Sequence, residues 1–206
     1  MTTPPTHLLL PAATRTWRPW KNGGGVMADI AVSPSTADWD TFKWRVGIAK
    51  IEKDGPFSTF PGVDRSFMIV GGKGVKLTVA GIEPARITHK SPPFAFPGES
   101  AATAQMTDGP TEALNIMVRR GGAQTRLALV DEPSEFVPGS EAFALLVWAR
   151  GRADLLIHGE PVSLGLHDAV LFEPGVNVKV RPGDHSHGWL IEARNIELAP
   201  PGAANS

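Results

Sequence analysis

Two histidines near the C-terminus have a spacing that suits metal binding. His185 and His187, in the sequence DHSHG, lie two residues apart, so on a β-strand their imidazoles would point to the same side. Glu192 follows as an acidic candidate, but no third histidine is close in sequence. The run also lies between Pro182-Gly183 and Gly188, which favours a solvent-exposed turn over a metal site.

A triple glycine near the N-terminus raises the question of phosphate binding. The sequence WKNGGG lacks the Gly-Lys-Ser/Thr ending of a P-loop, so we do not expect a nucleotide site. The glycines favour either a tight turn into a strand or a close approach of the backbone to another strand or to a ligand. If a ligand binds there, Trp20 would supply an aromatic wall and Asn22 a hydrogen-bonding amide.

A third candidate group lies on one predicted strand, in the sequence ALNIMVRR. Asn115 and Met117 are two residues apart and therefore share a face, which Arg119 continues. If that face points into the protein, the Asn115 amide needs a hydrogen-bonding partner. The alternatives are ordinary core packing for Met117 and a solvated strand end for Arg119.

Composition and charge exclude several other kinds of site. The 206 residues contain 20 Lys and Arg against 21 Asp and Glu, so no basic excess favours nucleic acid or an anionic membrane. Neither cysteine nor tyrosine occurs, which excludes disulfides, thiolate metal sites and a phenolic acid or base. The sequence has no Gly-x-Ser-x-Gly elbow for acyl transfer. No apolar run reaches the roughly 18 residues of a membrane span, so we expect a cytoplasmic protein.

The elements that position these residues are predicted to be short β-strands. In FKWRVGIAKI the even-numbered residues from 42 to 48 share an apolar face, and Arg45, on the other face, is expected to be structural. The 22 glycines and 19 prolines are scattered, as in sandwiches and barrels. Residues 66–81 are expected to form a hairpin around Gly-Gly-Lys-Gly, and residues 36–39 a short helix. The chain is therefore predicted to be all-β.

A linker divides the sequence unequally. Residues 131–142, DEPSEFVPGSEA, are rich in Pro, Ser and Glu. We predict an N-terminal barrel over residues 1–130, which would hold the ligand pocket, and a shorter C-terminal barrel over residues 131–206. Closing both sheets into barrels also removes exposed strand edges.

The segment GPFSTFPGVDRSFMIVGGKG resembles the first metal-binding motif of the cupin superfamily. In cupins, two histidines two residues apart and a downstream glutamate precede a Gly-x-Gly turn and bind a metal inside the barrel. Alignment on that turn places Ser58 and Phe60 at the histidine positions and Arg65 at the glutamate position. The second cupin motif corresponds to FAFPGESAA, where Ala101 stands in place of the third histidine. The resemblance implies a bicupin of the jelly-roll type, with two cupin-like barrels and neither a metal nor another cofactor.

An arginine inside the barrel has definite chemical consequences. The Arg65 guanidinium stays charged, and an unpaired buried charge is very costly, so it needs a partner. Asp29, Asp64 and Asp108 are candidates for an internal ion pair, and an anionic ligand is the alternative. The planar fork of a guanidinium suits a carboxylate, and Phe60 could stack on a planar ligand.

Longer blocks resemble the HutD/Ves family of bacterial bicupins. The chain contains, in the family's order, the blocks WKNGGGVMADIAV, FKWRVGIAKIEKDGPFSTFPGVDRSFMIVGGKG, FAFPGES and DGPTEALNIMVRRGG. The C-terminal half matches only in the spacing of its strands. The family commonly has threonine and glutamate after the triple glycine, where this chain has Met27 and Asp29, so the preferred ligand could differ.

The resemblance implies a function in binding rather than a defined reaction. HutD is associated with histidine-utilisation operons, and such proteins are thought to bind a small intermediate, such as urocanate or formylglutamate, and to limit pathway expression. We therefore expect a small-carboxylate-binding regulator or sensor, with a possible homodimer by analogy with cupins. The alternatives are a metal-independent isomerase or hydrolase acting on a small acid, and a bicupin with a purely structural role. The residues expected around the ligand are Trp20, Asn22, Ser58, Phe60, Arg65, Asn115, Met117 and Arg119.

Overall fold

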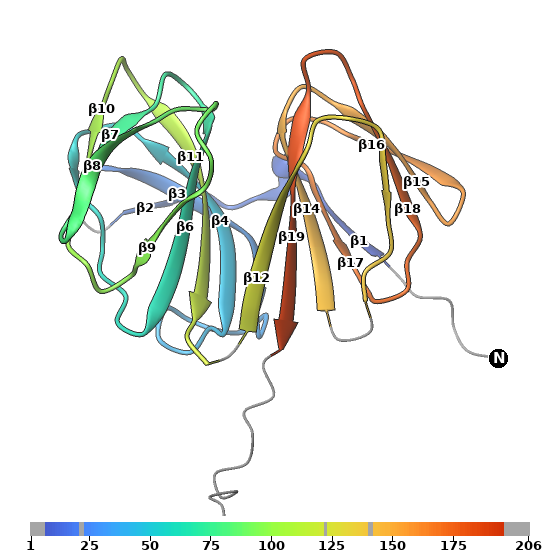
Figure 1. Ribbon diagram of the computed structural model, residues 1–206, viewed down its shortest axis with the longest axis horizontal. Helices are drawn as coiled ribbons and strands as arrows, with labels where there is room; N and C mark the ends of the chain where they lie inside the picture. Colours follow the sequence, from blue (N-terminus) through green and yellow to red (C-terminus); the bar gives the residue numbers. More distant parts are fainter. Residues whose placement is uncertain (1–6, 21–22, 122, 140–141, 196–206) are drawn as a thin grey trace, which may run out of the picture.

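The computed structural model describes residues 7–20, 23–121, 123–139 and 142–195, and these form two antiparallel β-barrels side by side (Figure 1). Their only helical element is the 3-10 turn η1 (Ala12–Thr14), and no helix in this part of the chain could cross a membrane. Residues 36–39, predicted as a short helix, contain turns and irregular structure instead. The prediction of an all-β chain is confirmed.

The N-terminal barrel consists of two facing sheets around an apolar core. Phe67, Ile69 and Leu77 are buried between them. The larger sheet has the order β2 (Arg18–Pro19), β3 (Gly25–Ser33), β4 (Trp44–Ile51), β11 (Thr111–Arg119), β6 (Val63–Gly71) and β9 (Phe94–Pro97). The smaller sheet has the order β5 (Gly55–Pro56), β10 (Ala102–Met106), β7 (Val75–Val79) and β8 (Ile82–Ile87).

The C-terminal barrel repeats this arrangement. Leu146, Trp148 and Phe172 lie in its core. Its larger sheet has the order β1 (His7–Leu10), β17 (Ala169–Phe172), β14 (Ala142–Arg150), β19 (His187–Asn195) and β12 (Ala123–Val130). Its smaller sheet has the order β13 (Ser134–Phe136), β18 (Val178–Pro182), β15 (Ala153–Ile157) and β16 (Glu160–Leu164).

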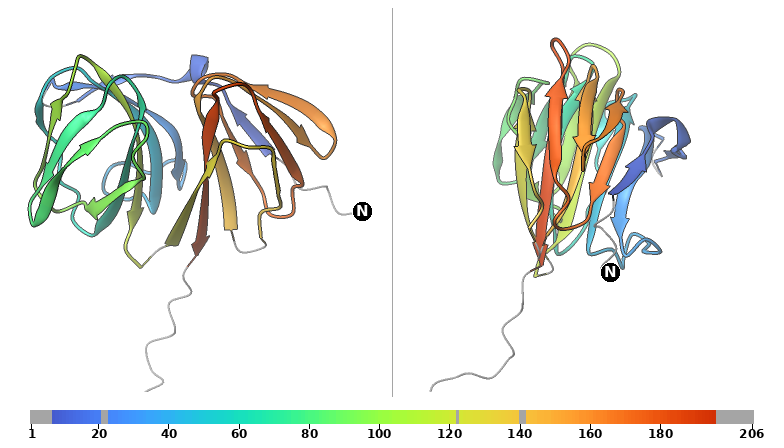
Figure 2. Two further views of the ribbon diagram at one scale, coloured as in Figure 1. Left: turned by 45° about the horizontal axis from the view of Figure 1, so that its top comes forward. Right: turned by 90° about the vertical axis from the view of Figure 1, so that its right-hand side faces the viewer.

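The two larger sheets pack against each other and form a third core between the barrels (Figures 1 and 2). Val46, Ile48 and Ile116 of one sheet lie in the same cluster as Leu145 and Val147 of the other. A strand in this position is buried on both faces, so its sequence reads as a continuous apolar run rather than an alternation. The run ALLVWA in β14 has this character, because each of its six residues is buried.

Two strands that precede the linker at residues 131–142 belong to the C-terminal barrel. β1 pairs with β17, and β12 pairs with β19, so both belong to the sheet of the C-terminal barrel although both precede residue 131. The N-terminal segment therefore crosses from one barrel to the other before β2, as Figure 1 shows in blue. This exchange ties the two barrels together through the backbone as well as through the shared core.

The predicted hairpin over residues 66–81 is wrong. β6 pairs with β11 and β9, whereas β7 pairs with β10 and β8, so the turn between them connects two facing sheets. Gly72 and Gly74 have φ angles of 78° and 102°, which side-chain-bearing residues rarely adopt. The glycines let the chain pass from one sheet of the barrel to the facing sheet. In a hairpin, the two strands would instead have paired within one sheet.

Candidate functional site

The candidate site lies on the inner face of the larger sheet in the N-terminal barrel. In the register of β4, β11 and β6, Met117 is opposite both Arg45 and Arg65, and Asn115 is opposite Gly47 and Phe67. Alternate residues of a strand share a face, and Phe67 belongs to the barrel core, so these side chains face the interior. We call the set Asp29, Arg45, Arg65, Asn115 and Met117 the inner wall.

Arg65 is the most unusual group on the inner wall. It is only 7% exposed, yet no carboxylate among the described residues forms an ion pair with it. Its Nη2 donates to Asn115 Oδ1 at 3.0 Å and its Nη1 to the Ser58 carbonyl at 3.3 Å, while Nε has no partner within the described part of the chain. Burial lowers the pKa of Arg65 to about 10, so the guanidinium remains charged at neutral pH.

Three phenylalanines surround the Arg65 guanidinium. Its Cζ lies 4.9 Å from the ring centroid of Phe96, 5.2 Å from that of Phe57 and 5.7 Å from that of Phe60. Trp20 packs edge-on against Phe57, with 6.0 Å between ring centroids. Cation–π attraction offsets a part of the desolvation cost, but an aromatic face does not replace a counter-ion.

Arg45 has the partner that Arg65 lacks. Its Nε and Nη2 each lie 2.6 Å from an Asp29 carboxylate oxygen, and its Cζ lies 3.6 Å from the Trp39 ring centroid. This pair takes up Asp29, a candidate partner of Arg65, and is consistent with the prediction that Arg45 is structural. Asp64, a second candidate, pairs with Arg120 on the outside of the barrel.

Solvent reaches the inner wall beside Arg65. The Asp29 side chain is 29% exposed, and Asn115 and Phe60 are half-buried. Gly47 stands between Asp29 and Asn115 in the register and contributes no side chain there. The wall is therefore partly accessible at Asp29, Asn115 and Phe60, while the Arg65 side chain itself is buried.

The sequence matches a known family of proteins. A sequence model described as HutD matches residues 12–188 of the chain. The chain belongs to the HutD family. It is 35% identical over 156 residues to a 21.2 kDa protein from the hutC 3' region of Pseudomonas putida, which covers 75% of this chain and 80% of the relative. Membership and this relative connect the chain to histidine utilisation.

Further comparisons agree with the family and the fold. Protein Ves of Citrobacter koseri is 36% identical over 115 residues, which are 54% of this chain and 58% of Ves. The structure of HutD from Pseudomonas fluorescens SBW25, in a formate condition, has a TM-score of 0.80 and 28% identity, and the match covers 93% of this chain and 100% of that one. An oxalate decarboxylase, at 7% identity and a TM-score of 0.61, shares the fold alone. The predicted bicupin architecture is thereby confirmed.

The remaining residues that were expected around the ligand differ in whether their side chains face the inner wall. Ser58 contributes its carbonyl rather than its hydroxyl, and its side chain is exposed. Met117 shares the face of Asn115 and packs in a small cluster with Phe42 and Val63. Arg119 donates to the carbonyls of Phe42 and Asp40, so it holds the turn before β4. Asn22 lies outside the described residues.

The sequence analysis missed the aromatic residues that complete the wall. Phe57 and Phe96 contact the Arg65 guanidinium, and Trp39 covers Arg45. Phe57 stands one residue before Ser58 and three before Phe60 in the motif that resembles the cupin metal site, so its position there could have drawn attention to it. Trp39 lies in a turn and carried no such signal.

The triple glycine has the structural role that the sequence favours. A Cβ on Gly25 would lie 2.0 Å from the Lys50 carbonyl oxygen, so β3 and β4 approach too closely there for any side chain. Gly23 has a φ of 66° in the turn that precedes β3. The glycines therefore form the turn between β2 and β3, directly after Trp20, whose ring packs against Phe57.

The histidine pair near the C-terminus divides between two environments. His185 is exposed on the turn before β19, as predicted, whereas His187 is half-buried at the start of β19. No group of three or more potential metal ligands occurs among the described residues.

His167 lies beside a turn, a position that favours the surface. Its side chain is nevertheless buried, with 8% exposure of the residue, and its Nε2 lies 3.7 Å from Glu112 Oε2 of the other barrel.

Proposed function

We propose that this HutD-family protein binds a small organic carboxylate on the inner wall of the N-terminal barrel and senses an intermediate of histidine utilisation. The observation that carries the proposal is the buried Arg65 guanidinium without a carboxylate partner in the described residues. A buried charge without a counter-ion is costly, and a bound anion removes that cost.

The hydrogen bonds of Arg65 support an anionic ligand. Both of its acceptors, the Ser58 carbonyl and Asn115 Oδ1, are neutral, and its Nε–H is unused among the described residues. A carboxylate can accept from such a group with a charge-assisted hydrogen bond, which is roughly twice as strong as a neutral one. The carboxylate of the ligand would be the counter-ion for the Arg65 guanidinium.

The surroundings of Arg65 define the kind of carboxylate. Asn115 accepts from Arg65 through Oδ1, so its Nδ2 remains a donor for an acceptor on the ligand. Phe60 is half-buried and offers a flat apolar surface beside the guanidinium. Urocanate, which is planar and has a single carboxylate, and formylglutamate, which has a formamide oxygen, fit these groups.

Thermal titration tests the proposal. Urocanate, formylglutamate and formiminoglutamate are each added to the protein, and the unfolding temperature is recorded. A ligand present at 100 times its Kd should add about 2.7 kcal/mol to the free energy of unfolding. Arg65→Gln should remove this gain, whereas Arg120→Gln, which removes an exposed ion pair on the outer surface, should keep it.

Two results would contradict the proposal. The first is the absence of any shift with all three acids, and the second is an equal shift in wild type and Arg65→Gln. The ligand is also assayed chemically after incubation. Conversion of a bound acid into product would make the same wall the active site of a metal-independent isomerase or hydrolase.

A further inference from the structure

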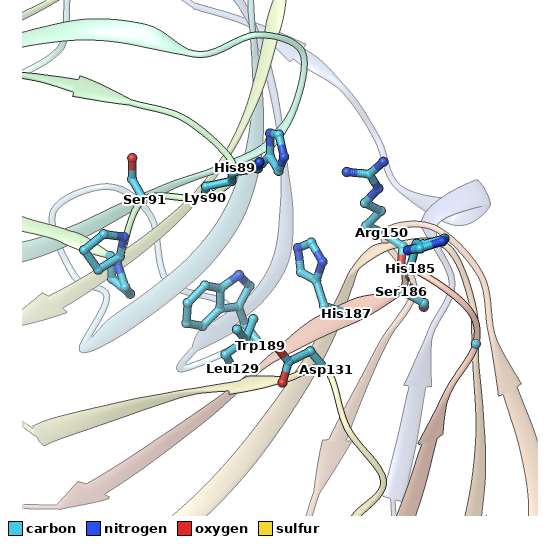
Figure 3. A pocket seen from close by; sticks show the side chains of 13 residues that line it. His89, Lys90, Ser91, Leu129, Asp131, Arg150, His185, Ser186, His187 and Trp189 are labelled. Carbon is cyan, nitrogen blue, oxygen red and sulfur yellow. Dashed lines mark hydrogen bonds between the residues drawn. The ribbon is translucent and has the colours of Figure 1, made fainter.

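A cavity lies between the two barrels, outside the inner wall (Figure 3). It has a volume of about 710 Å³, within the range of small-molecule sites. One side is the loop between β8 and β9, residues 89–93, and the other is formed by the turn before β19 with Arg150 and Leu129. We call it the inter-barrel cleft.

An arginine and two histidines from three different elements point into the inter-barrel cleft. Figure 3 shows His89, Arg150 and His187 directed toward the same space, although they are far apart in the sequence. Within the described residues, none of these side chains has a hydrogen bond or ion pair to a protein partner. Lys90 lies beside them on the wall. The cleft therefore gathers a guanidinium, an ammonium group and two imidazoles, and neither the guanidinium nor the imidazoles have a protein partner among the described residues.

The opposite part of the cleft is apolar. Trp189 is half-buried with its indole along the wall in Figure 3, and Leu129 is 48% exposed beside it. Pro92 and Pro93 complete this side from the other barrel. Exposed apolar surface next to unpaired cationic groups matches a ligand with an apolar body and an anionic end.

We propose that the inter-barrel cleft is a second ligand site, which binds an organic anion with a planar apolar body, its anionic group against Arg150, His89 and His187 and its body against Trp189. A metal ion fits less well, because the permanent charge of Arg150 repels a cation beside the two imidazoles. The proposal does not depend on the Arg65 site.

Protonation of His187 couples this binding to pH. Burial lowers the pKa of His187, and the nearby positive charges of Arg150 and His89 lower it further, while Asp131 acts in the opposite direction. Lys90 and His185 are the other ionisable groups of the cleft. A bound anion favours the imidazolium, so binding takes up a proton and becomes tighter as the pH falls below neutrality.

The experiment uses 2-naphthoate as the probe and two control compounds. Naphthalene-2-carboxamide lacks the negative charge, and acetate lacks the aromatic rings. Calorimetry should show naphthoate binding about tenfold or more tightly than either counterpart. Arg150→Gln and Trp189→Leu should each weaken it about tenfold. Arg152→Gln, at a neighbouring exposed arginine outside the cleft, should leave the affinity unchanged.

Nuclear magnetic resonance of the histidine rings locates the probe in the wild-type protein. Naphthoate should shift the His89 and His187 resonances and raise the pKa of His187, while His158 and His167 stay unchanged. Equal binding of naphthoate and its carboxamide, or unaltered binding to Arg150→Gln, would overturn the proposal. Loss of binding in Arg65→Gln alone would place the probe on the inner wall and would equally overturn a second site.

Discussion

The two barrels share one architecture, but their interiors contain different kinds of side chain. In the C-terminal barrel, Trp148 is fully buried among aliphatic residues, and its Nε1 donates to Ser186 Oγ at 2.9 Å. Ser186 Oγ lies within 2.8 Å of two backbone carbonyls, so each of these buried polar groups has a partner. In the N-terminal barrel, Arg65 is buried with a free Nε among the described residues. Both barrels have an apolar core, but the N-terminal one also contains a buried charge without a carboxylate partner among the described residues.

A second contrast lies within the N-terminal barrel itself. Arg45 and Arg65 flank Met117 in the same cross-strand row, and both are nearly inaccessible. Arg45 is neutralised by Asp29, whereas Arg65 has only neutral acceptors and aromatic rings. Burial alone therefore does not distinguish the two arginines, whereas the presence or absence of a carboxylate partner does.

The largest effect is expected from Trp148→Ala in the C-terminal barrel. Loss of a fully buried indole leaves a cavity and should cost about 3–5 kcal/mol of the free energy of unfolding. Denaturation in urea measures this change. A cost below about 1 kcal/mol would show that the C-terminal interior is not a packed core and would weaken the contrast between the barrels.

Arg45→Met should give the next largest loss. The substitution leaves the Asp29 carboxylate without its partner, and breaking a buried pair costs about 3–5 kcal/mol. Because Asp29 is partly exposed, we expect about 2–3 kcal/mol. Asp29→Asn with Arg45→Met should recover a part of this loss. An unchanged stability of Arg45→Met would show that the pair contributes nothing.

Arg65→Met, unlike Arg45→Met, should not lower the free energy of unfolding. It removes a buried charge that has no carboxylate partner, and water can reach Asn115, so stability should stay the same or rise by about 1 kcal/mol. Carboxylate binding should be lost in the same variant. A destabilisation as large as that of Arg45→Met would instead make Arg65 a structural group.

The smallest effect concerns pH and the contact between the barrels. Burial lowers the pKa of His167 in the folded state, although the nearby Glu112 carboxylate acts in the opposite direction. On acidification, His167 is therefore protonated at a higher pH in the unfolded chain than in the folded protein. Stability is therefore full above the unfolded pKa of about 6.5 and falls on acidification, by at most about 1.4 kcal/mol per pH unit. His167→Asn, which tolerates the φ of 65°, should reduce this slope between pH 6.5 and 5. An identical slope in the variant would exclude His167 as its source.

The sequence predicts the elements better than their contacts. Alternation identifies β4 and β11, and the alignment with the cupin motif correctly places Arg65 inside the barrel. The hairpin predicted at Gly72 and Gly74 is wrong, because the same glycines suit either a hairpin or a corner between two sheets. Local pattern cannot distinguish the two, since the partner strands are distant in sequence.

Long-range pairing also explains what was missed at the candidate sites. Nothing near Asp29 shows that it binds Arg45 rather than Arg65, because strand register decides the choice. The burial of His167 depends on the other barrel, and the inter-barrel cleft joins residues 89–93 to the start of β19. Such sites arise from the packing of the barrels and leave no local signature.

The central claim is that the Arg65 guanidinium binds the carboxylate of a ligand. Its Nε–H resonance, assigned by its absence from the spectrum of Arg65→Met, can be followed while urocanate or formylglutamate is added. The account predicts a saturable shift of this resonance with at least one acid, while the Arg45 Nε–H resonance stays in place. Saturable binding of the acid with an unmoved Arg65 resonance would contradict it.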